Sequence, residues 1–146
     1  RSWLPLSLAL LVGCITAIVS AVAIAVWLGA TPQLAATLGP KSATSPIAMA
    51  VSERLGGIPA LTAALVIGTG IFGAIVSRWV FELLRIRHDA ARGFALGLAA
   101  HGVGTARAFQ LSPEMGAFAG LAMGLNGALT ALFAPWLVPM VLAWTA

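Results

Sequence analysis

Three long stretches of this chain contain no charged residue, and short polar interruptions separate them. The uncharged stretches are Ser2–Pro40, Leu55–Ser77 and Met115–Ala146. An α-helix needs roughly 20 mostly apolar residues to cross the hydrocarbon core of a bilayer, and each stretch is long enough. The pattern therefore predicts an all-α integral membrane protein with about three full transmembrane helices, at Trp3–Leu28, at Ile58–Leu84 and from Gly116 onward.

The polar interruptions at Pro40–Pro46 and His101–Arg107 contain helix-breaking residues inside sequence that is apolar enough to lie in a bilayer. A break of this kind frees backbone N–H and C=O groups that lipid cannot satisfy. It is tolerated only where it packs against protein or lines a watery cavity. We therefore expect the two breaks to meet near the middle of the membrane and to form a binding site for a small anion.

Short helical segments flank each break. The sequence predicts helices at Thr31–Leu38, with Thr31 as N-cap, and at Pro46–Leu55, with Ser45 as N-cap, around the first break. It predicts helices at Ala90–Ala100 and Ala106–Leu111 around the second, and a further helix start with Ser112 as N-cap. Helices this short, at about 1.5 Å per residue, reach roughly halfway through the hydrocarbon core or less. Each pair is predicted to be a re-entrant hairpin, with two completely crossing broken helices as the competing geometry.

A weak internal match relates the two halves of the chain. Sliding the sequence by 60 positions places Lys41 on His101 and aligns stripes of small residues. Chance similarity between glycine- and alanine-rich helices is the alternative explanation. Residues 1–146 are expected to form one membrane domain with repeats at 31–84 and 90–143. One net crossing per repeat would invert the second repeat, as in many transporters.

The composition supports a membrane location. Apolar residues make up 60% of the chain and charged residues 8%, against about 25% charged in soluble domains. Half of the basic residues gather at Arg78, Arg85, Arg87 and Arg92. Such a cluster marks the cytoplasmic side of a membrane protein, and Arg1 is expected on that side. Contact with lipid headgroups is a weaker interpretation of this cluster, and the net charge of +4 is not taken as nucleic-acid affinity.

Polar and basic side chains gather at the two breaks. A helix N-terminus favours anions, hydroxyl groups add hydrogen bonds, and arginine can hold a carboxylate through two parallel bonds. These features suit a small monocarboxylate. The predicted substrate-binding residues are Lys41, Ser42, Thr44, Ser45, His101, Gly102, Gly104, Thr105, Arg107 and Asn126.

Structural roles are the alternatives for these side chains. Lys41 could extend to the membrane interface, and Arg107 could pair with Glu53 or Glu114. His101 could be a packing residue rather than a proton carrier, and Asn126 could simply bridge helices. The single Cys and two His residues have no metal-ligand spacing, and we predict no metal and no cofactor. No G-x-S-x-G motif is present, and Ser42 and His101 lack an orienting acid, so we also predict no catalytic residue and no enzyme activity.

Several strings in the sequence resemble the LrgB/CidB family of membrane proteins, and the similarity covers nearly the whole chain. The first group includes Trp3–Pro5, Pro40–Met49 and Leu55–Ala63. The second group includes Ala91–Gly93, Ala100–Ala108 and Gly116–Gly127. Family members have further N-terminal membrane segments, and the sequence lacks an initiator Met, so we expect the chain to begin inside a longer protein.

The resemblance implies two functions. One is transport of small organic acids such as pyruvate, and plastid relatives carry glycolate and glycerate. The other is an antiholin-like role that modulates murein hydrolase activity and autolysis together with a small LrgA/CidA-type membrane partner. A bacterial inner-membrane location and self-association are expected with either function. A carrier needs the buried cationic breaks, whereas a regulator that acts through oligomerisation does not.

Overall fold

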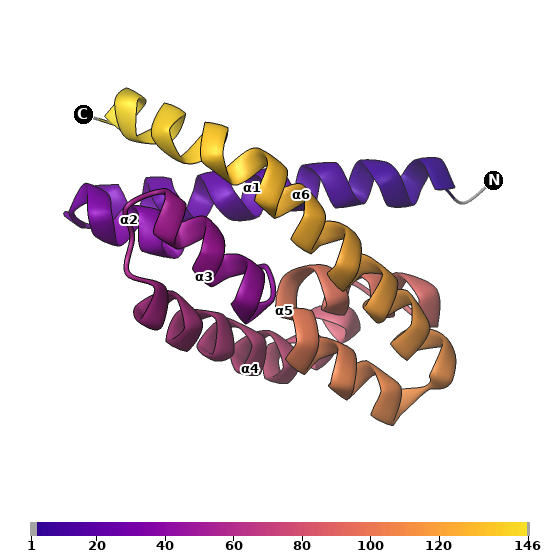
Figure 1. Ribbon diagram of the computed structural model, residues 1–146. Helices are drawn as coiled ribbons and strands as arrows, with labels where there is room; N and C mark the ends of the chain where they lie inside the picture. Colours follow the sequence, from indigo (N-terminus) through magenta and orange to yellow (C-terminus); the bar gives the residue numbers. More distant parts are fainter. Residues whose placement is uncertain (1–2, 146) are drawn as a thin grey trace.

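The computed structural model describes residues 3–145, which form six α-helices and no strand (Figure 1). The helices are α1 (Trp3–Trp27), α2 (Pro32–Leu38), α3 (Ser45–Arg54), α4 (Pro59–Leu83), α5 (Asp89–Leu111) and α6 (Pro113–Thr145). Three of them, α1, α4 and α6, are long and apolar enough to cross a membrane. This confirms the predicted all-α membrane protein with three spanning helices.

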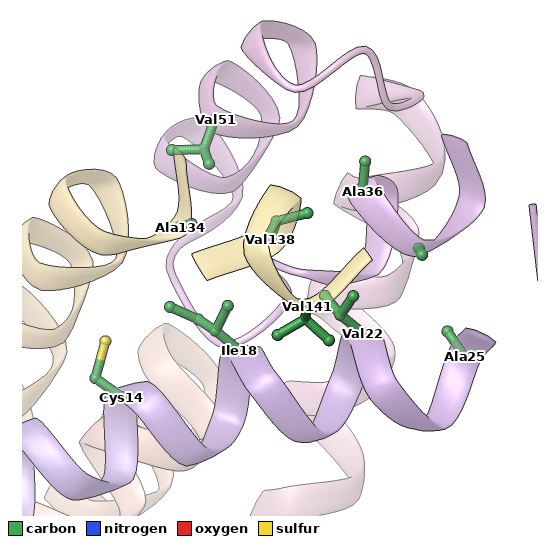
Figure 2. Packing of buried hydrophobic residues seen from close by; sticks show 10 residues of the cluster. Cys14, Ile18, Val22, Ala25, Ala36, Val51, Ala134, Val138 and Val141 are labelled. Atoms are coloured by element: carbon green, nitrogen blue, oxygen red, sulfur yellow. The ribbon is translucent and has the colours of Figure 1, made fainter. Parts of the chain in front are cut away.

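The largest apolar core lies where the second half of α1 packs against the last part of α6 and the α2–α3 segment (Figure 2). The α1 side chains recur at helical spacing, so one face of this helix is buried. Because lipid is as apolar as these side chains, close van der Waals packing holds the helices together here. The labelled core residues are Cys14, Ile18, Val22, Ala25, Ala36, Val51, Ala134, Val138 and Val141.

Helices α2 and α3 form a hairpin that is fastened to the start of α4 by hydroxyl groups. The Thr62 hydroxyl donates to the Thr37 carbonyl (3.0 Å) and shares a hydrogen bond with the Ser52 hydroxyl (2.7 Å). The Thr37 hydroxyl accepts from the Ile58 N–H (2.9 Å). All three hydroxyl-bearing residues are fully buried. The predicted N-cap at the start of α2 is also present, because Thr31 Oγ1 accepts from the Leu34 N–H.

Helix α5 folds back on itself. His101 interrupts it with φ 40° and ψ −127°, and Ser112 Oγ donates to Asp89 Oδ2 across 2.6 Å. A straight helix of this length would separate those ends by about 35 Å. Gly104 packs against the first half of α5, where a Cβ would lie 2.6 Å from the Leu96 carbonyl oxygen.

The element order gives two similar units. In the first unit the α2–α3 hairpin is followed by the long helix α4, and in the second the bent α5 is followed by the long helix α6.

The breaks differ in detail from the sequence prediction. Helix α3 begins at Ser45, so Thr44 is the N-cap, and the Thr44 side chain makes no capping hydrogen bond. In α5 the interruption predicted at His101–Arg107 is confined to its first residue, His101, and the residues after it are helical. Gly104 does not adopt a positive φ; its missing side chain allows the two halves of α5 to pack closely together.

Other boundaries also shift. Helix α5 begins at Asp89 rather than at Ala90, and Arg92 of the basic cluster lies in its first turn. Helix α6 begins at Pro113 rather than at Gly116, and it continues through Pro135 and Pro139 as expected. Neighbouring helices make such prolines tolerable in a membrane. Arg1, expected on the cytoplasmic side, lies outside the described residues.

Glycines let α5 and α6 approach closely. A Cβ at Gly93 would clash with the Met115 carbonyl oxygen, and a Cβ at Gly97 would clash with that of Ala119. The two glycines are four positions apart, the spacing that brings membrane helices into backbone contact. This contact fixes the first half of α5 against α6 and so sets the position of the bend.

Candidate anion site between the two bends

Asn126, in the middle of α6, joins the two breaks. Its Nδ2 donates to the Ser42 carbonyl (2.9 Å) in the first break and to the Leu98 carbonyl (3.2 Å) just before the second. Asn126 is only 1% exposed. In Figure 1 the turn between α2 and α3 and the bend of α5 lie next to each other near the middle of the molecule. The two interruptions therefore meet.

The bend in α5 explains why Asn126 is needed there. In an unbroken helix the Leu98 carbonyl would accept from the N–H four residues later, and that group lies beyond the bend at His101. The Asn126 amide replaces the missing donor. The Ser42 carbonyl, on the turn between α2 and α3, is likewise satisfied by this amide.

Two buried polar atoms at this junction have no hydrogen-bond partner among the described residues: His101 Nε2 and Asn126 Oδ1. His101 is 4% exposed. The two carbonyl partners fix the orientation of the Asn126 amide, because a carbonyl can only accept. The atom left over is therefore the acceptor Oδ1.

The His101 imidazole is held in place by α4. Its ring lies against the backbone of Val66, and a Cβ at Gly70 would lie 2.6 Å from its Cε1 atom. The unpartnered Nε2 can accept or donate in the neutral imidazole, depending on the tautomer, and donates in the imidazolium. The carbonyl of His101 accepts from the Thr105 hydroxyl (2.8 Å).

The first break supplies positive charge and donors. Lys41 Nζ donates to Ser42 Oγ (3.3 Å), and the Lys41 charge acts electrostatically on His101. Ser42 is buried, whereas Thr44 and Ser45 are half-buried at the start of α3. Free N–H groups at a helix N-terminus favour an anion. The break thus presents an ammonium group, hydroxyl groups and a helix N-terminus.

The remaining predicted residues lie in different surroundings. Thr105 is buried, but its hydroxyl is already used by the His101 carbonyl, and Gly102 is exposed. Arg107 is exposed and its Nη1 donates to Gln110 Oε1 (3.0 Å). It lines a separate cleft with Arg78, and none of the junction residues Ser42, His101 and Asn126 lines that cleft. It has no ion pair with Glu53 or Glu114 in residues 3–145.

Several residues that shape this region were not among the predicted ones. Thr37, Ser52 and Thr62 hold the first hairpin against α4, and Val66 and Gly70 seat the imidazole. Buried hydroxyls on otherwise apolar helices were the available signal for the first group. The role of Gly70 depends on a neighbour distant in sequence, which no local pattern reveals.

The arrangement defines a class of protein: an all-helical membrane protein whose two bent hairpins meet around a buried polar centre. Long apolar helices α1, α4 and α6 surround that centre. The chain belongs to the LrgB-like family, whose family model matches residues 1–140.

Individual relatives agree with this membership. Uncharacterized protein YwbG of Bacillus subtilis is 43% identical over 127 residues, which are 87% of this chain and 56% of that protein. An uncharacterized protein of Haemophilus influenzae is 34% identical over 141 residues, which are 97% of this chain and 61% of that protein. Antiholin-like protein LrgB of Bacillus mycoides is 30% identical over 141 residues, with the same coverage.

The chain spans about three-fifths of the length of these curated relatives. No solved structure matches it significantly.

Proposed function

We propose that the protein to which this chain belongs carries a small monocarboxylate, such as pyruvate, glycolate or glycerate, across a bacterial inner membrane. The observation that carries the proposal is the pair of unpartnered buried atoms, His101 Nε2 and Asn126 Oδ1, at the meeting point of the bends. Leaving a buried polar atom without a partner costs about 1–3 kcal/mol. A ligand that satisfies both atoms is therefore favoured.

The chemistry of these atoms selects among small acids. A carboxylate is attracted by Lys41 and by the N-terminus of α3, while Asn126 Oδ1 requires a hydrogen-bond donor. A 2-hydroxy acid offers both a carboxylate and a hydroxyl donor. Glycolate and glycerate should therefore bind more tightly than pyruvate, which has no hydroxyl. Arg107 is not included in this contact set because it lies in a separate cleft.

Access to the proposed site requires movement. Ser42, His101 and Asn126 are all less than one-tenth exposed, so in this conformation the junction is closed. We propose that the α2–α3 hairpin separates from the bend of α5 to admit the ligand from one side at a time. Inverted repeats at 31–84 and 90–143, rocking against each other, would give such alternating access.

A second candidate function is supported by the name of the Bacillus mycoides relative, Antiholin-like protein LrgB. In this alternative the protein regulates murein hydrolase activity and autolysis by self-association or with a small LrgA/CidA-like membrane partner. Helix α4 offers a face for such contacts, because Ile67, Ile71 and Phe72 are about half exposed or more. The buried polar junction has no necessary role in that mechanism.

Uptake of radiolabelled glycolate, glycerate and pyruvate into proteoliposomes that contain the intact protein tests the transport proposal. We expect Asn126→Leu and His101→Gln to reduce glycolate uptake roughly tenfold or more, as loss of a hydrogen bond to a charged ligand implies. Matched controls are Gln33→Leu and His88→Gln, which change an exposed amide and an exposed imidazole. Absence of uptake of all three acids by the unmodified protein would reject transport and favour the regulator.

A further inference from the structure

A second polar cavity lies away from the junction of the bends. It is a cleft of about 530 Å³ between the end of α4, both halves of α5 and the start of α6. Three arginines, Arg78, Arg92 and Arg107, line it together with a single acidic residue, Glu82. Arg78 lies on α4, whereas Arg92 and Arg107 lie on the first and second halves of α5. The three side chains line one cleft because α5 folds back on itself.

The charges in the cleft are not balanced. Arg78 Nε pairs with Glu82 Oε1 at 3.0 Å. Arg92 donates from Nε to the Ile86 carbonyl (2.9 Å) and its guanidinium lies over the Phe81 ring, 5.6 Å from the centroid.

Among the described residues, the Arg107 guanidinium hydrogen-bonds only to the neutral amide of Gln110. Two full positive charges, on Arg92 and Arg107, therefore remain without a carboxylate partner in the described part of the chain.

The arginines are already partly oriented. The backbone bond and the aromatic ring hold the Arg92 guanidinium so that its terminal N–H groups stay available. Guanidinium groups bind phosphate oxygens through paired hydrogen bonds and lose little freedom on doing so. The cleft thus has the chemistry of a phosphate site.

The surroundings of the cleft are those of a membrane boundary. Leu111, which lines the cleft, and Trp79 and Leu83, which follow Arg78 on α4, are each more than half exposed, which suits contact with lipid chains. Phe81 also lines an almost wholly apolar groove of about 210 Å³ between α4 and α5. A guest with a phosphate and acyl chains fits this combination better than a freely soluble anion does.

We propose that the Arg78–Arg92–Arg107 cleft binds the phosphate of an anionic phospholipid headgroup. Basic pockets between transmembrane helices at the cytoplasmic surface are suited to such headgroups. Binding there would brace the folded-back second half of α5 against α4. The proposal does not depend on the proposed transport function, because it concerns a different cavity and different residues.

Native mass spectrometry of the intact protein, extracted from nanodiscs of mixed phosphatidylglycerol and phosphatidylcholine, tests the proposal. We expect retained phosphatidylglycerol, little phosphatidylcholine, and a loss of affinity of roughly fivefold for each arginine removed. The variants are Arg92→Gln and Arg107→Gln, with Arg54→Gln, which precedes the opposite end of α4, as the matched control. Arg107→Gln keeps the fold, because this side chain is exposed and hydrogen-bonds only to Gln110 among the described residues.

Three results of the lipid-retention measurement would overturn the proposal. They are equal retention of the two lipids, unchanged phosphatidylglycerol retention in Arg107→Gln, or an equal loss in Arg54→Gln. Titration with inorganic phosphate separates the possible sources of the anion. Binding of inorganic phosphate to the cleft with no phosphatidylglycerol retained there would assign the cleft to a soluble anion and reject the lipid.

Discussion

Asn126 and Ser42 lie 84 positions apart in the sequence, yet the Asn126 side chain donates to the Ser42 backbone carbonyl across 2.9 Å. The same amide donates to the Leu98 carbonyl at the edge of the α5 bend. One side chain on α6 therefore holds both interruptions together. Any opening of the junction has to break or exchange at least one of these two bonds.

Replacing Asn126 with leucine should destabilise the protein and leave two buried carbonyls without a donor. Hydrogen bonds between membrane helices average about 0.6 kcal/mol and reach about 1.7 kcal/mol, so a loss of about 1–2 kcal/mol is expected. Thermal unfolding of the purified protein in detergent measures this as a lower melting temperature. Gln33→Leu, at an exposed position, should change it little, and an equal shift in both variants would contradict the role of Asn126.

His101 gives a separate prediction, because a residue with a Cβ holds a positive φ of 40° there. Such strain costs of order 1–3 kcal/mol, and glycine avoids it. His101→Gly should therefore be more stable than His101→Ala by about 1 kcal/mol. Both variants lose the imidazole, so both should lose glycolate uptake. Equal melting temperatures for the two variants would show that the bend does not strain residue 101.

The main features of the fold follow from local patterns in the sequence. The length of the uncharged stretches predicted the three spanning helices. Thr31 and Pro32 correctly predicted the start of α2. Ser112 was also readable as a helix start, and its Oγ accepts from the Met115 N–H. Each of these features depends on residues within one or two helical turns.

The position of Arg107 could not be predicted in the same way. Arg107 follows His101 by only six residues, so the sequence suggested that both side chains lie together at the second break. The fold-back of α5 instead carries Arg107 about two turns away along the second half, into the cleft with Arg78. The direction in which a bent helix leaves its bend depends on packing against α4 and α6. The inverted symmetry of the two units stays a prediction.

The contact between α5 and α6 should depend on glycine. A methyl group at Gly97 would overlap the Ala119 carbonyl, so Gly97→Ala forces the helices apart. Overpacking of this kind typically costs about 1–3 kcal/mol. Gly68→Ala is the matched control, because no atom lies within 4 Å of a Cβ there and alanine favours the helix. We expect a lower melting temperature only for Gly97→Ala, and equal effects would disprove the close contact.

Cysteine labelling can test whether the two bends meet at a place that water reaches. Cys14, the single native cysteine, is 1% exposed and should stay unlabelled in the folded protein. A membrane-impermeant maleimide should label Gly102→Cys, since residue 102 is exposed with open space around it.

Ser42→Cys should react more slowly, because Ser42 is 7% exposed at the closed junction. If the junction binds a small acid, glycolate should slow the labelling of Ser42→Cys further and leave Gly102→Cys less affected. Ile71→Cys on the outer face of α4 serves as the lipid-facing control and should not react. If Ile71→Cys were labelled as fast as Gly102→Cys, the labelling rate would not distinguish residues that face water from residues that face lipid. Complete resistance of both break positions would mean that the bends are sealed from water in every state the protein visits.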